Sequence, residues 1–244
     1  MISLPHASRL AVLALAALLA CGAGATRAED DQHAPCTEDA MLVFDASGSM
    51  AGNGWGYGSE NPTAVSRLDR VQRALSKILP TVTRFRRVGL ITYGTGAYNQ
   101  CDVQLQLPPA KNAADRILAT VRALVPTGRT PLSTAVEQAA EVLDFRQKPG
   151  IVVLLTDGEE TCGGFPCELG ARLHDEAQQL TVHVIGLRVE GYTWMGEQTL
   201  LDVKCLAEKN GGLYLAVETE EELIKALERT LGCPMVTQHA TPPR

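Results

Sequence analysis

The sequence contains no run of basic residues and, beyond residue 28, no apolar stretch long enough to cross a membrane. The first absence argues against nucleic acid or anionic lipid as a partner, and the second against a transmembrane span. The 244 residues include 22 Lys and Arg against 28 Asp and Glu, a net charge of −6. Residues 1–28 hold two of the basic residues and none of the acidic ones, so without them 20 basic and 28 acidic residues remain, a net charge of −8. The length, an apolar content of 45% and a charged content of 20% suit one globular α/β domain.

The signatures of several enzyme classes are also missing. No Gly-x-x-x-x-Gly-Lys-Ser/Thr loop is present to hold a phosphate group. Around Ser47, Asp45 and Ser49 stand where a Gly-x-Ser-x-Gly nucleophile motif needs glycine. A magnesium-dependent phosphotransferase with Asp45 as its nucleophile would need a second Asp at the position of Ser47. We therefore expect a non-enzymatic binding protein. The alternatives are a magnesium-dependent phosphotransferase or hydrolase, and a structural or regulatory subunit with a stabilising metal.

The first residues are typical of an export signal. Arg9 precedes an apolar run over residues 10–20, which is too short to span a membrane, and small residues follow it. The Leu-Leu-Ala-Cys sequence that ends at Cys21 resembles a bacterial lipoprotein signal, in which cleavage after residue 20 leaves Cys21 lipidated. The rival is cleavage after Ala25 or Ala28, and we favour a signal peptide over residues 1–28. We therefore expect a periplasmic or secreted protein, attached to a membrane only if Cys21 is lipidated.

Histidine does not accompany cysteine at the spacing of zinc ligands, which argues against a zinc site. Six Cys residues remain after the signal region, and an even number in an exported protein favours disulfide bonds. One pair is near enough in sequence to close a short loop, a second pair flanks the folded region, and the third follows by default. The pairs in this scheme are Cys162–Cys167, Cys36–Cys233 and Cys101–Cys205.

The remaining chain predicts a linker over residues 29–37, one folded domain over residues 38–233, and a mobile tail over residues 234–244. Within the domain, segments with the apolar pattern of strands are separated by segments with helical spacing, one of them at residues 168–180. This order predicts a mostly parallel sheet with helices on both faces. Residues 101–107 alternate apolar and polar side chains, as at a sheet edge, and Pro108 is expected to end that strand. The predicted strands are residues 41–44, 88–93, 101–107, 151–155, 181–189 and 213–217.

Five Asp, Ser and Thr residues are candidates for a single metal site. Two of them, Asp45 and Asp157, follow predicted strands, and open parallel sheets bind ligands at the carboxyl ends of their strands. Hydroxyl groups with carboxylates behind them suit a hard divalent cation that keeps part of its water. Gly48 is expected to permit the turn after Asp45. Each motif alone is equally typical of a turn or a helix cap. The candidates are Asp45, Ser47, Ser49, Thr130 and Asp157, and we expect Mg²⁺, with Ca²⁺ or Mn²⁺ as alternatives.

Three motifs in this order resemble the metal-ion-dependent adhesion site of the von Willebrand factor type A domain family. They are Asp-x-Ser-x-Ser at residues 45–49, Thr-Pro-Leu at 130–132 and Thr-Asp-Gly at 156–158, and the likeness, which extends to secreted bacterial members, covers roughly residues 38–233. The resemblance implies a doubly wound, mostly parallel α/β sheet of six strands with one antiparallel edge strand. It implies that Ser47, Ser49 and Thr130 bind the metal directly, while Asp45 and Asp157 act through water. The partner would be a protein that presents an Asp or Glu to the metal.

The chain departs from this pattern in the segment that follows Ser49. Residues 51–62 form a long, Gly-rich loop that holds Trp55 and Tyr57. Because this loop is expected near the rim of the metal site, the two aromatic residues are candidates for contact with a partner. A flexible linker with incidental aromatic residues is an equal alternative.

Overall fold

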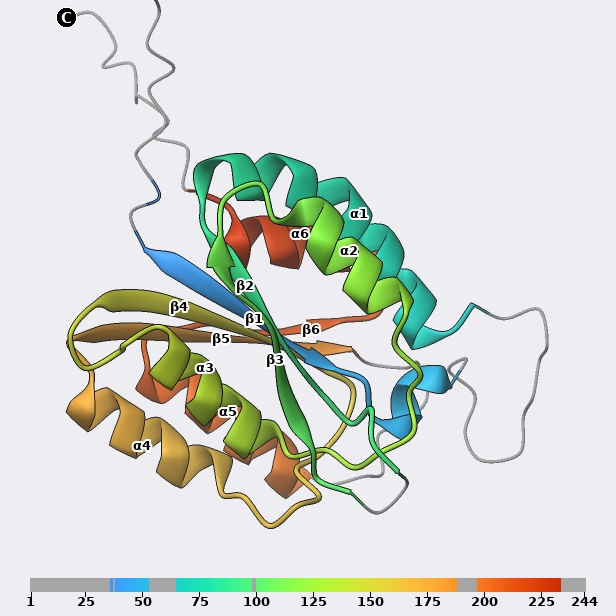
Figure 1. The fold of residues 1–244 in the computed structure, drawn as a ribbon. Helices are drawn as coiled ribbons and strands as arrows, with labels where there is room; N and C mark the ends of the chain where they lie inside the picture. The colour runs from blue at the N-terminus through green and yellow to red at the C-terminus, as the bar shows by residue number, and fades with distance from the viewer. Residues whose placement is uncertain (1–35, 37, 53–64, 98–99, 188–196, 234–244) are drawn as a thin grey trace, which may run out of the picture. The chain divides into compact units, whose positions relative to one another are not determined.

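A computed structural model describes a six-stranded sheet whose strands follow the order β3-β2-β1-β4-β5-β6. Every neighbouring pair is parallel except β2 and β3, which pair in the antiparallel direction. This confirms the predicted mostly parallel sheet with one antiparallel edge strand (Figure 1). The described residues are 36, 38–52, 65–97, 100–187 and 197–233. The strands are β1 (Asp39–Asp45), β2 (Val88–Tyr93), β3 (Val103–Ala110), β4 (Pro149–Thr156), β5 (Gln179–Leu187) and β6 (Tyr214–Val217).

Several sequence-based predictions fall outside the described residues. They concern the signal segment with Cys21, the linker except for Cys36, the aromatic residues Trp55 and Tyr57, and the tail.

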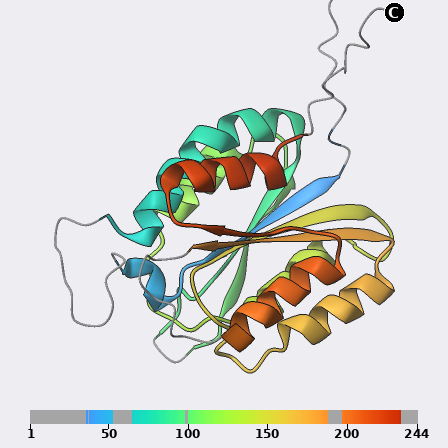
Figure 2. The same cartoon turned by 180° about the vertical axis from the view of Figure 1, so that it is seen from behind.

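Helices cover both faces of the sheet, because the strands that form its centre are apolar on both sides. Along β1, alternate residues enter two separate cores: Leu42 and Phe44 face one, Met41 and Val43 the other. The first core is closed by α1 (Arg67–Phe85), α2 (Ala114–Arg122) and α6 (Glu220–Leu231). The second is closed by α3 (Leu132–Val142), α4 (Pro166–Glu176) and α5 (Glu197–Lys209). Figure 2 shows the two helical layers on either side of the sheet, in a view from the back of the molecule. A short 3₁₀ helix, η1 (Gly48–Ala51), follows β1.

Several strands begin or end a few residues from the predicted positions, and at two boundaries strand pairing overrides a local sequence signal. Strand β3 does not end at Pro108 but continues to Ala110, with shifts in its pairing to β2. Prolines are tolerated on an edge strand and at irregularities in strand pairing, where a regular ladder hydrogen bond is not required. The helix expected to reach residue 180 ends at Glu176, and Leu180 instead pairs with Gly150 between β5 and β4.

The described residues form three disulfide bonds, and one of these matches a predicted pair. Cys36–Cys233 joins the segment before β1 to the end of α6, as expected. The predicted Cys162–Cys167 and Cys101–Cys205 pairs are wrong, because Cys167 faces the neighbouring helix rather than its own loop. In the structure Cys167 on α4 pairs with Cys205 on α5, and Cys162 after β4 pairs with Cys101 before β3.

These disulfides indicate an extracytoplasmic protein, since disulfides persist in oxidising compartments. Among the helices that the structure describes, none has both the length and the apolar content that a membrane span requires.

Candidate metal-binding site

The candidate residues lie where three segments of the chain meet at one end of the sheet. Strand β1 ends at Asp45 and pairs with β4, which ends at Thr156, so the loops after both strands leave the sheet together. The backbone N–H of Gly48 donates to the carbonyl oxygen of Gly128 at 3.1 Å. This bond places the segment that carries Thr130 beside the loop after β1.

Hydrogen bonds join four of the five candidates into one chain. The backbone N–H of Ser47 donates to Asp45 Oδ1 at 2.8 Å, and the hydroxyl oxygens of Ser47 and Ser49 lie 3.1 Å apart. The Ser49 hydroxyl then donates to Asp157 Oδ1 at 2.6 Å. Residues more than a hundred positions apart are thus within hydrogen-bond distance of one another.

The fifth candidate, Thr130, borders the same space. A Cβ atom placed on Gly158 would lie 3.7 Å from Ser49 Oγ and 4.0 Å from Thr130 Oγ1, so both hydroxyls face this position. The main chain of Thr130 is fixed by Thr161, whose side-chain oxygen accepts from Thr130 N at 2.8 Å. Thr161 N donates in return to the carbonyl oxygen of Thr130 at 3.0 Å. The structure therefore brings all five sequence candidates together.

The two carboxylates sit in an environment that disfavours their negative charge. Asp45 is fully buried, and burial raises its pKa, although hydrogen bonds from Ser47 and Thr156 oppose that rise. Burial also raises the pKa of Asp157 to about 7, and the negative charge of Asp45 adds to this effect. Arg67 opposes it. Asp45 has no ion-pair partner among the described residues, so the site has two carboxyl groups against the single cationic group of Arg67.

Two site residues were not predicted from the sequence, although Tyr93 ends a predicted strand and Thr156 directly follows one. Thr156 donates its hydroxyl to Asp45 Oδ2 at 2.7 Å. Tyr93 pairs with Asp45 across β1 and β2, and its buried hydroxyl lies beside Asp45 and Thr156. That hydroxyl forms no hydrogen bond of ordinary geometry with any described residue. Their places at the ends of neighbouring parallel strands were the signal that could have revealed them.

The glycine that the site requires is Gly94 rather than Gly48. Gly94 follows β2 with a φ of 78°, and a Cβ atom there would lie 2.5 Å from Ser47 N. Gly48 has no positive φ, and a Cβ there would make only ordinary contacts. The left-handed conformation and the close approach of two loops both exclude a larger residue at position 94.

Arg67 is a third unpredicted residue of the site. It lies in the first turn of α1, where Ser66 and Asp69 form a capping box. One guanidinium nitrogen donates to Asp157 Oδ2 at 2.9 Å and to the carbonyl oxygen of Ser49 at 2.7 Å. No local sequence pattern predicts this contact, because it joins residues 90 positions apart.

The chemistry of these side chains fits a hydrated divalent cation. Three hydroxyls and two carboxylates offer only oxygen atoms, which are the ligands that Mg²⁺, Ca²⁺ and Mn²⁺ prefer. The buried hydroxyl of Tyr93, which lies beside Asp45 and Thr156, and the carboxyl group of Asp45, which has no ion-pair partner among the described residues, are groups that such a cation with its water would satisfy. Within the described ranges no three His, Cys, Asp or Glu residues form another metal-binding group.

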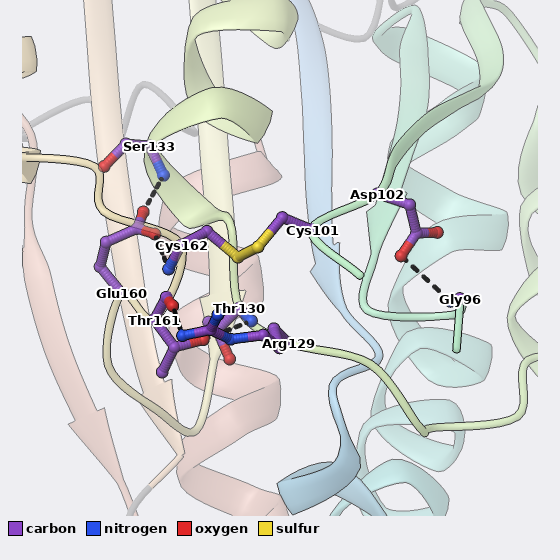
Figure 3. The surroundings of a disulfide bond; sticks show 9 residues. All are labelled: Gly96, Cys101, Asp102, Arg129, Thr130, Ser133, Glu160, Thr161 and Cys162. Carbon is purple, nitrogen blue, oxygen red and sulfur yellow. Dashed lines mark hydrogen bonds between the residues drawn. A yellow bond between two sulfur atoms is a disulfide. The ribbon is translucent and has the colours of Figure 1, made fainter. Parts of the chain in front are cut away.

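One disulfide braces the loop that fixes Thr130 (Figure 3). Cys162 directly follows Thr161, and its partner Cys101 directly follows Gln100, whose carbonyl oxygen accepts from Arg129 N at 3.2 Å. The Arg129 side chain also donates to the carbonyl oxygen of Thr161. The disulfide and these hydrogen bonds form a closed ring around the segment that presents the Thr130 hydroxyl.

Removal of this disulfide is expected to weaken metal binding. In a variant with Cys101→Ser and Cys162→Ser, Thr161 is held less firmly beside Thr130. We expect the Mg²⁺ affinity to fall by up to about tenfold, at the lower end of the effects measured when residues that orient metal ligands are replaced. Calorimetric titration measures it. The matched control is Cys167→Ser with Cys205→Ser, which removes a disulfide between α4 and α5. Equal Mg²⁺ affinity in both double variants would remove the proposed link between disulfide and site.

Comparison with known proteins agrees with this architecture. Residues 40–160, about half of the chain and including all five candidates, match the von Willebrand factor type A domain. This segment is therefore similar to a domain of that type, and the sheet has the same α/β fold; such domains are commonly protein-interaction modules. It is 28% identical over 212 residues to the uncharacterized protein YwmC of Bacillus subtilis (strain 168), covering 82% of this chain and 85% of that protein.

Solved structures share the fold. An aerotolerance-related membrane protein from Bacteroides fragilis superposes with a TM-score of 0.57 at 20% identity, over 80% of this chain and 98% of that one. A von Willebrand factor type A structure from Catenulispora acidiphila gives a TM-score of 0.55 at 18% identity, over 80% of this chain and 42% of that one. Identities this low support the fold and not a shared function.

Proposed function

We propose that the protein is an exported, non-enzymatic binding module that captures an acidic residue of a partner protein through a divalent cation. The observation that carries this proposal is the meeting of Ser47, Ser49 and Thr130 with two buried carboxylates at the ends of β1 and β4. The three hydroxyls would hold the metal directly, and Asp45 and Asp157 would hold it through water. Mg²⁺ is the expected ion, with Ca²⁺ or Mn²⁺ as alternatives.

Neutral direct ligands explain why such a site would bind an acid. Hydroxyl oxygens leave most of the positive charge of a cation uncompensated, so the bound ion supplies an electrostatic anchor for an Asp or Glu carboxylate. Ser49 is exposed while Ser47 and Thr130 are buried, which gives the site one side open to solvent. A partner can therefore approach without any change in the described core.

The state of Asp45 argues against the enzyme alternative. Its side chain is fully buried, and both carboxylate oxygens accept hydrogen bonds, from Ser47 N and from the Thr156 hydroxyl. A carboxylate nucleophile needs a free oxygen that a substrate can reach. We therefore assign Asp45 a role in charge compensation and positioning.

The proposal also includes export, with removal of residues 1–28 and a periplasmic or secreted mature protein. Lipidation at Cys21 is the alternative, which would make it an envelope lipoprotein. The mass of the mature N-terminus distinguishes them: a chain that begins at Glu29 supports our proposal, and a diacylated Cys21 contradicts it.

The test of binding begins with calorimetric titration of the oxidised domain with Mg²⁺, Mn²⁺ and Ca²⁺ separately. We expect saturable binding of at least one ion. A crosslinked pull-down from the native envelope with and without chelator follows, and we expect captured protein only when metal is present. Capture that survives chelation, or titrations that show no uptake of any of the three ions, would falsify the proposal.

A further inference from the structure

The side chain of Arg67 bridges the two loops that carry the proposed metal ligands. Its guanidinium reaches Asp157 in the loop after β4 and the carbonyl oxygen of Ser49 in the loop after β1. The Arg67 side chain is 19% exposed and that of Asp157 is completely buried, so this is a largely desolvated ion pair. Both oxygens of Asp157 are thereby engaged, one by the Ser49 hydroxyl and the other by Arg67.

Three other basic residues of α1 point elsewhere. Arg73 and Lys77 pair with Glu220 at the start of α6, and Arg70 donates to the carbonyl oxygen of Glu218. Arg67 differs from them because it is directed into the candidate site by the geometry of the helix start. Its backbone N–H donates to Gly52, and the capping box of Ser66 and Asp69 fixes the first turn of the helix.

We propose that Arg67 is a resident cation of the site, which holds the two ligand loops together without metal and competes with the divalent ion when it binds. This inference rests on the proposed metal site. A guanidinium on Asp157 stabilises the buried carboxylate and spans both loops, so the metal-free site keeps its shape. The same positive charge repels a dication and occupies an oxygen that would otherwise accept a hydrogen bond from metal-bound water.

The competition has a consequence for the partner. Because Arg67 neutralises part of the charge of Asp157, the site offers less negative charge to the cation, and the bound cation keeps more attraction for a carboxylate from outside. Arg67 thus lowers metal affinity and raises the affinity of the loaded site for an acid. If Arg67 had a purely structural role, it would support both metal binding and the binding of an acid by the loaded site. Loss of Arg67 would then weaken both.

The experiment compares wild type with Arg67→Gln at pH 8.5, using calorimetric titration with Mg²⁺ and thermal unfolding with and without Mg²⁺. The variant should bind Mg²⁺ at least about threefold more tightly, as expected when a like charge next to the site is removed. Its Tm in chelator should fall by a few degrees, because the ion pair is lost, while the rise in Tm on addition of Mg²⁺ should become larger. Arg73→Gln, on the same helix, is the control and should leave Mg²⁺ affinity unchanged.

Two further variants keep the test decisive. Arg67→Lys retains the charge and should bind Mg²⁺ with the affinity of wild type, within about twofold. If Arg67→Gln does not fold, Arg67→Met retains the apolar stem and takes its place. A wild type that binds Mg²⁺ and a neutral variant that binds it equally or more weakly would overturn the role of Arg67 alone. Absence of Mg²⁺ binding in every variant would overturn the metal site itself.

Discussion

Replacement of Asp45 by Asn is expected to lower the Mg²⁺ affinity by about 10–100-fold, the usual cost of losing a partner that acts through a bound ligand. Asp45 is buried without an ion-pair partner in the described part of the chain, so its charge serves the cation rather than a neighbouring side chain. An Asn side chain has the same shape. Its oxygen can still accept from Ser47 N, and its amide can donate to the Thr156 hydroxyl.

The same substitution should leave the metal-free protein at least as stable as wild type. Burial raises the pKa of Asp45, which means that the ionised carboxylate is unfavourable when no cation is present. Calorimetric titration and thermal unfolding in chelator measure the two effects together. Asp102→Asn is the control, since its hydrogen bonds to described residues join it to Thr95 and Gly96 in the neighbouring loop and to Gln104. If Asp45→Asn binds Mg²⁺ as tightly as wild type, Asp45 has no part in a metal site.

Removal of the Cys36–Cys233 disulfide is expected to cost up to about 5 kcal/mol of unfolding free energy. The two residues lie 197 positions apart, and in the chain-entropy account a crosslink that closes so long a loop stabilises most. For a domain of this size that loss lowers Tm by roughly 10–20 °C. The variant is Cys36→Ser with Cys233→Ser, and denaturant and thermal unfolding measure the change.

The site should be spared in this variant. Cys36 precedes β1, while Asp45 lies at the other end of that strand, roughly 20 Å away for a strand of this length. We therefore expect Mg²⁺ affinity within about twofold of wild type at a temperature where the variant is folded. The Cys167–Cys205 disulfide closes a shorter loop, of 38 positions, so its removal by Cys167→Ser with Cys205→Ser should cost less unfolding free energy. A change below about 1 kcal/mol for the Cys36–Cys233 pair would show that the chain ends contribute little to stability.

Much of the fold followed from local patterns. The fully apolar segment in β4 predicted a central strand, and the alternation in β3 predicted an edge strand; both are confirmed. These patterns are reliable because a central strand between two layers of helices must be apolar on both faces. An edge strand can carry polar side chains on one face. The metal-binding roles of the five candidates remain predictions, although the structure brings the residues together.

The sequence by itself determined which chemistry could gather at the ends of β1 and β4, because parallel strands bring residues such as Asp45 and Asp157 to the same edge. Only the tertiary structure decided which side chains from other parts of the chain contact the residues at that edge. Arg67 reaches Asp157 across 90 positions, and Cys162 pairs with Cys101 rather than with nearby Cys167. The physical reason is that strand and helix patterns report the environment of each residue alone. Contacts between loops depend on how far each helix extends and where its first turn begins, which packing sets for the whole chain.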